Sequence, residues 1–417
     1  MKADLLLSLI SISLFFLIGC KGKSSEPNMF DEESSLPVVL QLENVHKAEG
    51  QEMLSVLNPV IEYIALETKE ESIMRQVSKA VILNNGNLLV SDNQSINLYS
   101  SNGKHIRQVS QRGNGPADYV RITGLVANPL TGGFFMSTLK KCVEFDADGN
   151  YVDNFEIEDR PMDMVLDPEG RLVFHRMNVP KAPDDVLPTW FIFRYDTSGA
   201  ELKRFEDKTP RMGGDDILSI VTPLRPMYVY KDKVRFNEFG NDTIFTVEEE
   251  ELRPYAILGL GEMRMSASPR GSREDSEATY NEMQKKLYLS FLEEDDQFFY
   301  MTFGWGFGGS YLYATYSKKD GKVTNYGNSQ FNYPAGGLTN DIDGGPAFFP
   351  LEIDSNGNRI MWRTAESFRK EMLESADLAV RKNKYGDKFS KVHKLAESLE
   401  DDDNPVLMIV RNTKSSK

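Results

Sequence analysis

The middle of the chain repeats, and this repeat restricts the possible folds more than any other feature of the sequence. Each unit of about 40 residues holds four short runs of β-forming residues, which are joined by turns rich in Gly, Asn and Asp. The second hairpin turn of the unit recurs in register at residues 101–103, 146–149 and 196–199. Such residues supply the positive φ that tight hairpins require. A four-stranded antiparallel unit of this length is typical of a β-propeller blade, whereas a β-sandwich does not need turns in register.

The sequence therefore predicts an all-β fold, a six-bladed β-propeller of four-stranded antiparallel blades over residues 38–411. A propeller has to close its ring, and the β-runs at residues 59–66 and 406–410 are the expected closing pair. From residue 365 to 399 the apolar spacing changes to that of two amphipathic helices, split near residues 383–386. We expect these as a short helical insertion before the last strand.

The first 20 residues have the pattern of a secretory signal. A charged start is followed by an apolar stretch over residues 5–18, which is shorter than the roughly 20 residues of a membrane-spanning helix. Residues 17–20 resemble the lipobox of bacterial lipoproteins, and this resemblance implies that Cys20 is acylated and anchors the chain in a membrane. A simple cleaved signal with a chance cysteine is the alternative. Residues 21–37 are polar and are expected to form a flexible tether, and residues 412–417 a short tail.

Charge and cysteine content exclude several classes of protein. The chain has 63 acidic and 48 basic residues and a formal net charge of −15, the opposite of what a non-specific nucleic-acid binder needs. With two cysteines it has neither a structural zinc cluster nor a disulfide framework. We expect Cys142, which alternates with Val143 and Phe145, to pack in a strand.

Five phrases of the sequence look familiar as a set. They lie at residues 64–68, 112–119, 240–245, 340–346 and 403–410. Together they resemble the six-bladed β-propeller lipoproteins of Bacteroidota, whose blades are similar to NHL repeats, over about residues 40–411. The chain departs from the usual Gly-Glu-Tyr phrase, since it has Ala117-Asp118-Tyr119. The resemblance implies the fold and a place in the cell envelope, on the outer membrane. It does not distinguish the periplasmic side of this membrane from the cell surface. It brings no catalytic residues.

Three places are candidates for ligand contact. The first is the Gly-rich segment after the first blade, with Arg112, Asp118, Tyr119 and Arg121, where a rigid scaffold would carry a functional loop. Its glycines and proline are equally consistent with a connection that only routes the chain across the ring.

The second place is Asn340 with Asp341 and Asp343, whose oxygens suit a hard cation such as Ca²⁺, although the same pattern also makes a plain turn. No other cofactor is expected. The third is Trp305 with Phe307 and Tyr311, which would suit a sugar platform, or which pack between blades.

Two functions remain open at this point. The chain contains no metal-ligand spacing of histidines, no nucleophile elbow and no phosphate loop, which favours a lipid-anchored binding or scaffold module for a glycan, peptide or partner protein. The alternative is a polysaccharide hydrolase or lyase of the envelope with its site at the channel mouth. Two facing carboxylates in a deep pocket would favour this enzyme.

Overall fold

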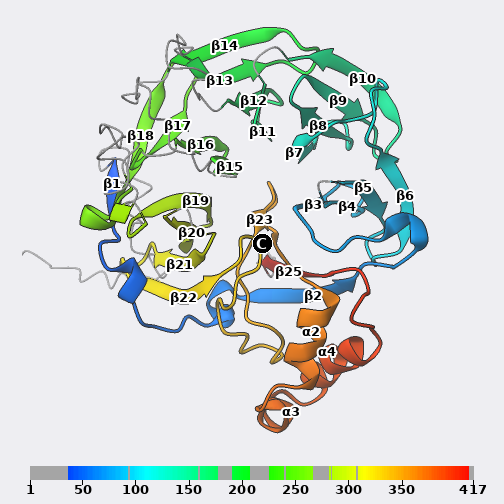
Figure 1. The fold of residues 1–417 in the computed structure, drawn as a ribbon, viewed down its shortest axis with the longest axis vertical. Coiled ribbons are helices and arrows are strands. Elements are labelled where there is room, and N and C mark those ends of the chain that lie inside the picture. Colours follow the sequence, from blue (N-terminus) through cyan, green and yellow to red (C-terminus); the bar gives the residue numbers. More distant parts are fainter. Residues whose placement is uncertain are drawn as a thin grey trace, which may run out of the picture.

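The computed structural model of the chain consists of six antiparallel sheets arranged as a ring (Figure 1). It describes residues 36–92, 94–157, 160–176, 190–206, 225–238, 241–265, 281–282, 284–306 and 309–412. Each sheet is a blade whose four strands follow one another outwards from the centre, so the predicted six-bladed propeller is confirmed.

Blades 1 to 5 follow in sequence order. Blade 1 is β3 (Lys79–Ile82), β4 (Leu88–Ser91), β5 (Ile96–Tyr99) and β6 (His105–Ser110). Blade 2 is β7 (Ile122–Ala127), β8 (Phe134–Thr138), β9 (Lys141–Phe145) and β10 (Tyr151–Glu156). Blade 3 is β11 (Asp163–Leu166), β12 (Leu172–His175), β13 (Trp190–Tyr195) and β14 (Glu201–Glu206). Blade 4 is β15 (Met227–Tyr230), β16 (Lys233–Asn237), β17 (Thr243–Val247) and β18 (Leu252–Gly259). Blade 5 is β19 (Leu287–Glu294), β20 (Phe298–Trp305), β21 (Tyr311–Ser317) and β22 (Val323–Ser329).

Blade 6 closes the ring by joining the two ends of the chain. It contains β23 (Glu352–Ile353), β24 (Arg359–Arg363) and β25 (Val406–Asn412) from the C-terminal part, and β2 (Pro59–Ala65) from the N-terminal part. β2 pairs with β25 antiparallel from Pro59↔Asn412 to Ala65↔Val406, as predicted. An additional strand, β1 (Val38–Gln41), extends blade 4 by pairing in parallel with β18. In the described part of the chain, short 3-10 helices lie in the connections at Val45–Lys47, Leu54–Leu57, Glu70–Ser72 and Gly261–Met263.

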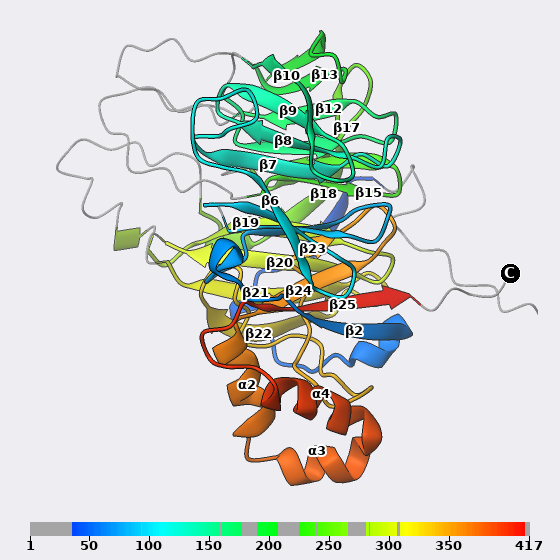
Figure 2. The same cartoon turned by 90° about the vertical axis from the view of Figure 1, so that its right-hand side faces the viewer.

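The helical insertion lies between β24 and β25 and forms three helices rather than the two expected. They are α2 (Ala365–Leu373), α3 (Leu378–Tyr385) and α4 (Asp387–Glu397). Thr364 begins α2, because its hydroxyl accepts a hydrogen bond from the Ser367 N–H at 3.2 Å. The insertion packs beside β2 at the outside of blade 6, through Phe368 of α2 and Phe389 of α4 (Figures 1 and 2). None of the helices among the described residues is long and apolar enough to cross a membrane.

The hydrophobic core is divided among the interfaces between neighbouring blades. Leu98 of blade 1 packs with Phe134 of blade 2, and Phe236 of blade 4 packs with Val173 of blade 3. Cys142 is fully buried between blades 2 and 3, as expected, and burial raises the pKa of its thiol. Because both faces of each blade are covered, most strands are apolar on successive residues rather than on alternate ones.

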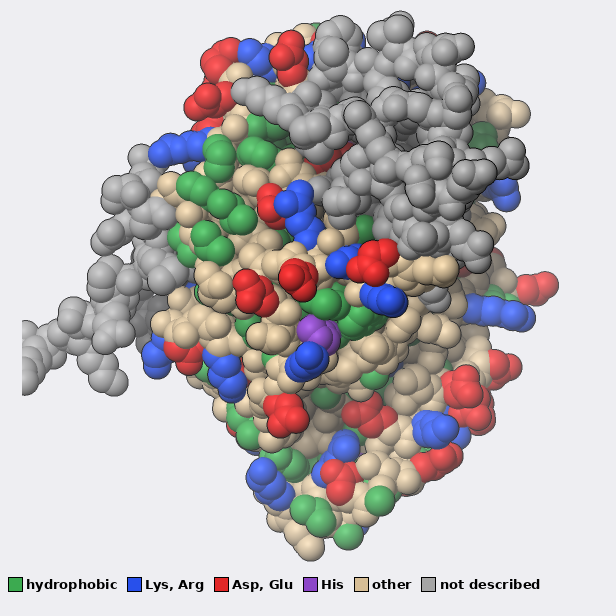
Figure 3. Space-filling model, turned by 60° about the vertical axis from the view of Figure 1, so that its left-hand side comes forward, with side chains coloured by type: hydrophobic (Ala, Val, Ile, Leu, Met, Phe, Trp, Pro, Cys, Tyr) green, Lys and Arg blue, Asp and Glu red, His purple; other side chains and the backbone are tan. Residues whose placement is uncertain are grey.

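The antiparallel order gives the ring two different faces. The hairpin turns after the first and third strand of each blade lie on one side, which we call the turn face, and the connections after the second and fourth strand lie on the other, the loop face. Figure 3 shows acidic and basic side chains interspersed on the side of the molecule that it presents. A mixed surface of this kind is typical of a solvated domain.

Candidate functional site

The first predicted site lies in the connection from blade 1 to blade 2 on the loop face. This connection contains Arg112, Asp118, Tyr119 and Arg121 and is held by contacts within the loop. Asp118 turns back into the loop and accepts a hydrogen bond from the Gly115 N–H at 2.8 Å. Tyr119 is buried in the interface of blades 1 and 2, where burial raises its pKa to about 12. Arg112 and Arg121 are exposed. Two of the four predicted residues therefore hold the loop in place, and two point into solvent.

The predicted aromatic site lies on blade 5. Trp305 ends β20, is half-buried, and meets the ring of His46 edge-on at a centroid distance of 6.0 Å. Tyr311 begins β21 and packs against Phe331 at 5.2 Å. Phe307 lies outside the described residues. The two described rings thus contact neighbours within the fold, and the sugar platform stays a prediction.

The predicted cation site, Asn340 with Asp341 and Asp343, lies in the segment before β23 of blade 6. Asp343 is buried and accepts hydrogen bonds from the hydroxyl of Tyr63 at 3.0 Å and the amide of Asn340 at 2.7 Å. Burial raises the pKa of the Asp343 carboxyl. Asp341 instead binds Ser55, through its backbone N–H at 2.9 Å and its hydroxyl at 2.6 Å. The two carboxylates therefore bind different partners, and the Ca²⁺ site stays a prediction.

No hydrogen bond or ring contact among the described residues joins these three predicted places to one another. No group of three or more His, Cys, Asp or Glu side chains suited to a metal ion occurs in the described part of the chain. Cys20, and with it the predicted anchor, lies outside the described residues.

A central cavity of about 500 Å³ is the strongest candidate site in the structure. The innermost strands of all six blades line it, and its mouth lies on the turn face, where the turns after β3, β11, β15 and β23 surround it. An innermost strand has no further strand on its inner edge, so its backbone also offers unpaired donors and acceptors to the cavity. A concave site of this size suits a small ligand.

Arg225 crosses the channel and forms the floor of the cavity. It precedes β15 of blade 4, yet its guanidinium donates to the Leu351 carbonyl at 2.5 Å and to the Glu352 carboxylate at 2.6 Å, both at blade 6. It also donates to the carbonyl of Ser78 at blade 1, which lies opposite blade 4 in the ring. The planar fork of an arginine suits such a bridge, because it holds several donors at fixed angles.

Glu293 of β19 lines the same floor and has no fixed partner there. Its side chain is about nine-tenths buried, and its Oε2 atom has no hydrogen-bond partner among the described residues. Burial raises the pKa of Glu293 well above its ordinary value, and the charge of Glu352 raises it further. The cations Arg225 and Lys79 act in the opposite direction but more weakly. Glu293 is therefore a buried carboxyl with a raised pKa and an unpartnered oxygen, and it lines the cavity.

Lys79 begins β3 and is the other unengaged group at the floor. It lines the cavity, is partly exposed, and forms no hydrogen bond or ion pair within the described ranges. Asp163 lies nearby at the start of β11, where its carboxylate accepts from the Met227 N–H of blade 4 at 3.2 Å. Burial raises the pKa of Asp163, while the charge of Lys79 opposes this rise.

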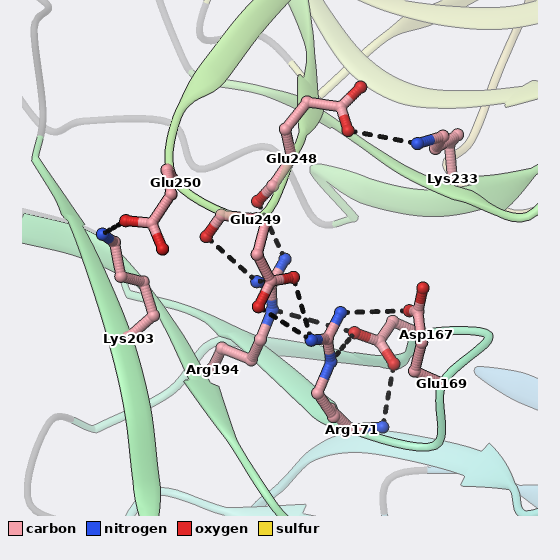
Figure 4. Close-up of polar contacts among 9 residues, drawn as sticks. All are labelled: Asp167, Glu169, Arg171, Arg194, Lys203, Lys233, Glu248, Glu249 and Glu250. Carbon is pink, nitrogen blue, oxygen red and sulfur yellow. Dashed lines mark hydrogen bonds and ion pairs between the residues drawn. The ribbon is translucent and has the colours of Figure 1, made fainter.

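Acidic residues at the mouth are held by basic ones from blade 3. Asp167, in the turn after β11, accepts from Arg171 at 2.7 Å, and Arg194 lies 3.7 Å from the same carboxylate (Figure 4). Arg171 and Arg194 also bind Glu249, in the turn between β17 and β18 of blade 4, at 2.9 and 3.1 Å. This cluster joins the turns of two blades beside the cavity.

Four residues of the floor were not predicted from the sequence, namely Lys79, Arg225, Glu293 and Glu352. The signal that was available is the run Glu293-Glu294-Asp295-Asp296, which directly follows an apolar β-run. Three of these four side chains are buried, and burying charges is costly unless they have partners or a function. Lys79 and Arg225 carry no such signal, because their neighbours in sequence are ordinary strand and loop residues.

Comparisons with known proteins agree with the fold. A crystal structure of a protein described as exported, from Bacteroides fragilis NCTC 9343, matches with a TM-score of 0.61 at 15% identity, covering 90% of this chain and 100% of that one. A member of the DUF4221 family from Bacteroides vulgatus ATCC 8482 matches with a TM-score of 0.42 at 12% identity, covering 66% and 86%. At this identity the first match supports the fold alone. The comparison with curated proteins finds no match.

The model of one protein family matches residues 41–411, which span the whole ring from the end of β1 to β25. The chain therefore belongs to the family described as "Domain of unknown function (DUF4934)".

Proposed function

We propose that this chain is a binding module of the bacterial cell envelope that holds a small glycan or peptide fragment in the central cavity. The observation that carries the proposal is Glu293, a buried carboxyl with an unpartnered oxygen at the floor of a cavity of about 500 Å³. A buried polar group without a partner costs stability. A site that keeps such a group is a candidate for ligand contact.

The proposed location rests on the N-terminal sequence. Residues 17–20 have the lipobox pattern, and the Bacteroides fragilis protein of similar fold is described as exported. A lipid on Cys20, followed by the polar residues 21–37, would hold the ring away from the outer membrane. Replacement of Cys20 by Ser should move the chain from the membrane to the soluble fraction and abolish palmitate labelling. Protease treatment of intact cells then separates surface display, where the ring is lost, from a periplasmic position, where it survives.

Ligand binding is tested with the detergent-solubilised full chain and a panel of monosaccharides, amino acids and short envelope-derived glycans and peptides. Ala127 of β7 lines the cavity and is half-buried, so Ala127→Trp should fill the cavity and abolish binding of any ligand found. Ile353→Trp, on another blade, is the second blocking variant. Binding that survives in both folded variants, or a panel without any ligand, would contradict the proposal.

A hydrolase or lyase is the second candidate, and one observation favours it. Glu293 on β19 and Glu352 on β23 both lie at the floor, where the charge of Glu352 adds to the raised pKa of Glu293 and Glu352 is paired with Arg225. Glycoside hydrolases use such a pair of carboxyl groups with different charge, one as acid and one as base or nucleophile. Product release from an envelope polysaccharide, abolished by Glu293→Gln, would establish the enzyme. Retained binding without product supports the binding module.

A further inference from the structure

Apart from Glu293, the acidic residues around the cavity floor have partners, whereas the cation Lys79 forms no ion pair with any described residue, and this difference indicates the chemistry of the ligand. This inference rests on the proposed binding function. Glu352 is paired with Arg225 at 2.6 Å, and Asp295 with Arg359 at 2.6 Å. Burial raises the pKa of the Glu293 carboxyl, which favours its neutral form, and its Oε2 atom has no hydrogen-bond partner among the described residues.

The other two acidic residues of the run 293–296, Glu294 and Asp296, have partners too. Asp296 accepts from the Tyr230 hydroxyl at 3.0 Å and lies 3.6 Å from the Lys231 ammonium. Glu294 is fully buried and receives the ammonium of Lys318 at 2.7 Å, with the guanidinium of Arg235 at 3.7 Å. The hydroxyls of Tyr228 and Tyr255 donate to its two oxygens at 3.2 and 3.1 Å. Among the described residues of the floor, Lys79 is thus a charged group that forms no ion pair, and Asp163 nearby already accepts hydrogen bonds from the Met164 and Met227 N–H groups.

The acidic residues of the turns at the cavity mouth do not pair with Lys79 either. Asp167 is held by Arg171, and Asp354 accepts the backbone N–H groups of Asn356 and Asn358 in its own turn, at 2.9 and 2.8 Å. Asp232 is exposed in the turn after β15. A ligand that reaches the floor therefore meets one ammonium that forms no ion pair within the described ranges and one carboxyl with a raised pKa and an unpartnered oxygen.

We propose that the cavity binds the carboxylate group of a small organic acid, which accepts hydrogen bonds from the Lys79 ammonium and from the carboxyl proton of Glu293. Both donors lie at the floor, whereas Arg225 is already occupied by three acceptors. Charge-assisted hydrogen bonds of this kind are the strong ones in a partly desolvated site. A sugar acid and the carboxyl end of an amino acid share this chemistry.

Binding should then depend on pH in a defined direction. Four ionisable groups face Glu293: Glu352 of β23, Arg225 before β15, Lys79 of β3 and Asp163 of β11. A bound carboxylate favours the protonated form of Glu293, so a proton is taken up from solvent once the free carboxyl has ionised. Affinity should therefore be highest at mildly acidic pH and fall as the pH rises through the raised pKa of Glu293.

The experiment compares matched probes by calorimetry on the detergent-solubilised full chain. Glucuronate is compared with glucose, and N-acetylalanine with N-acetylalaninamide, since each pair differs at the carboxylate. We expect the acid of at least one pair to bind at least tenfold more tightly than its neutral partner, and the pair that binds identifies the source. Lys79→Met should remove this preference. Glu293→Gln should retain much of the binding, because the amide donates a hydrogen bond, but lose the pH dependence.

The inference is overturned if neutral and acidic probes bind alike, or if Lys79→Met leaves the preference unchanged. That result is distinguishable from failure of the proposed function. When a neutral compound binds and Ala127→Trp abolishes its binding, the cavity is a binding site and only the carboxylate is wrong. When no compound of either panel binds, both proposals fail.

Discussion

Asn404 is a buried side chain that stabilises the seam of the ring, by which we mean the pairing of β2 with β25 that closes blade 6. It lies just before β25, and its amide donates to the carbonyls of Glu67 at 2.9 Å and Ser72 at 2.8 Å. Its Oδ1 accepts from the Met74 N–H at 2.7 Å. Residue 404 thereby connects the C-terminal strand to the segment between β2 and β3, some 330 positions earlier in the sequence. Its hydrogen-bonding groups are all used, which is what a buried amide requires.

Replacement of Asn404 by Ala should lower the free energy of unfolding by about 2 kcal/mol, because the buried Met74 N–H loses its partner and the carbonyls of Glu67 and Ser72 each lose one of two donors. Urea unfolding of the two proteins, followed by circular dichroism, measures the difference. Asn328→Ala is the matched control, since Asn328 is exposed on β22 and should change stability by less than about 0.5 kcal/mol. Equal effects of the two substitutions would show that the seam does not depend on residue 404.

Glu293 also predicts how stability depends on pH. Its ordinary pKa is 4.5, and burial raises it in the folded chain. The folded state then keeps a proton that the unfolded state has lost, so this contribution to stability is complete below pH 4.5 and disappears as the pH rises through the raised pKa. Glu293→Gln is always neutral and should gain stability relative to the wild type with rising pH.

Urea unfolding at several pH values from about 4 to about 9 follows this difference. Glu251→Gln, at an exposed position of the turn after β17, serves as the control and should track the wild type. A wild-type and Glu293→Gln difference that stays constant over the range would mean that Glu293 is ionised in the folded chain.

At the scale of elements, neighbouring blades are joined by polar clusters as well as by apolar packing. Arg194 of β13 is almost fully buried, and it donates to the Glu248 carbonyl at 3.0 Å and to the Glu249 carboxylate at 3.1 Å (Figure 4). Lys203 of β14 binds Glu250 of the same turn, but that pair is largely in solvent. One hairpin turn thus receives a buried and an exposed cation from the adjacent blade.

Arg194→Met should lower the free energy of unfolding by about 2 kcal/mol, because hydrogen bonds of a charged group are lost and the buried Asp167 carboxylate loses a nearby cation. Lys203→Met should cost less than about 1 kcal/mol, as exposed pairs do, and its effect should shrink in high salt. The two variants are compared by urea unfolding at low and high salt. If Lys203→Met proves the more damaging, the buried cluster does not join the blades as described.

The acidic runs at residues 248–251 and 293–296 show which features of the elements follow from local sequence patterns and which do not. The turns and apolar runs were enough for the blades, because their periodicity is set locally by backbone geometry. Residues 248–251 and 293–296 are both runs of four acids, yet the first forms a turn with mostly exposed side chains, and three of the second are buried. The difference comes from Lys318, Arg235 and Arg359, which reach the second run from other strands. Contacts of this kind are not contained in local sequence.

The same limit explains the helices and the site. Three helices replace the expected two because the chain turns at residues 374–377 before α3, a break that the apolar spacing does not mark. The channel floor combines Lys79, Arg225, Glu293 and Glu352 from four blades. No two of them lie within 50 residues in sequence, so only the folded ring brings them together.

At the scale of the whole molecule, the cavity exists only because the ring is closed. Seven residue pairs join β2 to β25, and residues 406–410 are all buried. Without this seam, blades 1 and 6 would expose apolar faces, and Arg225 could not bind residues of both blades at once. Closure therefore couples stability to the binding site, since blade 6, which closes the ring, also supplies Glu352 to the floor.

Ending the chain after Pro405 should abolish cooperative folding, because β25 and its buried residues are lost while β2 and β24 keep unpaired edges. Size-exclusion chromatography and thermal unfolding should show aggregation or no transition. A chain that ends after Asn412 keeps the whole strand and should unfold like the full chain. Ile409→Asp, which places a charge at a fully buried position of the seam, should lower stability severely without shortening the chain. A truncated chain that still unfolds at the full-length midpoint would show that the ring holds without its closing strand.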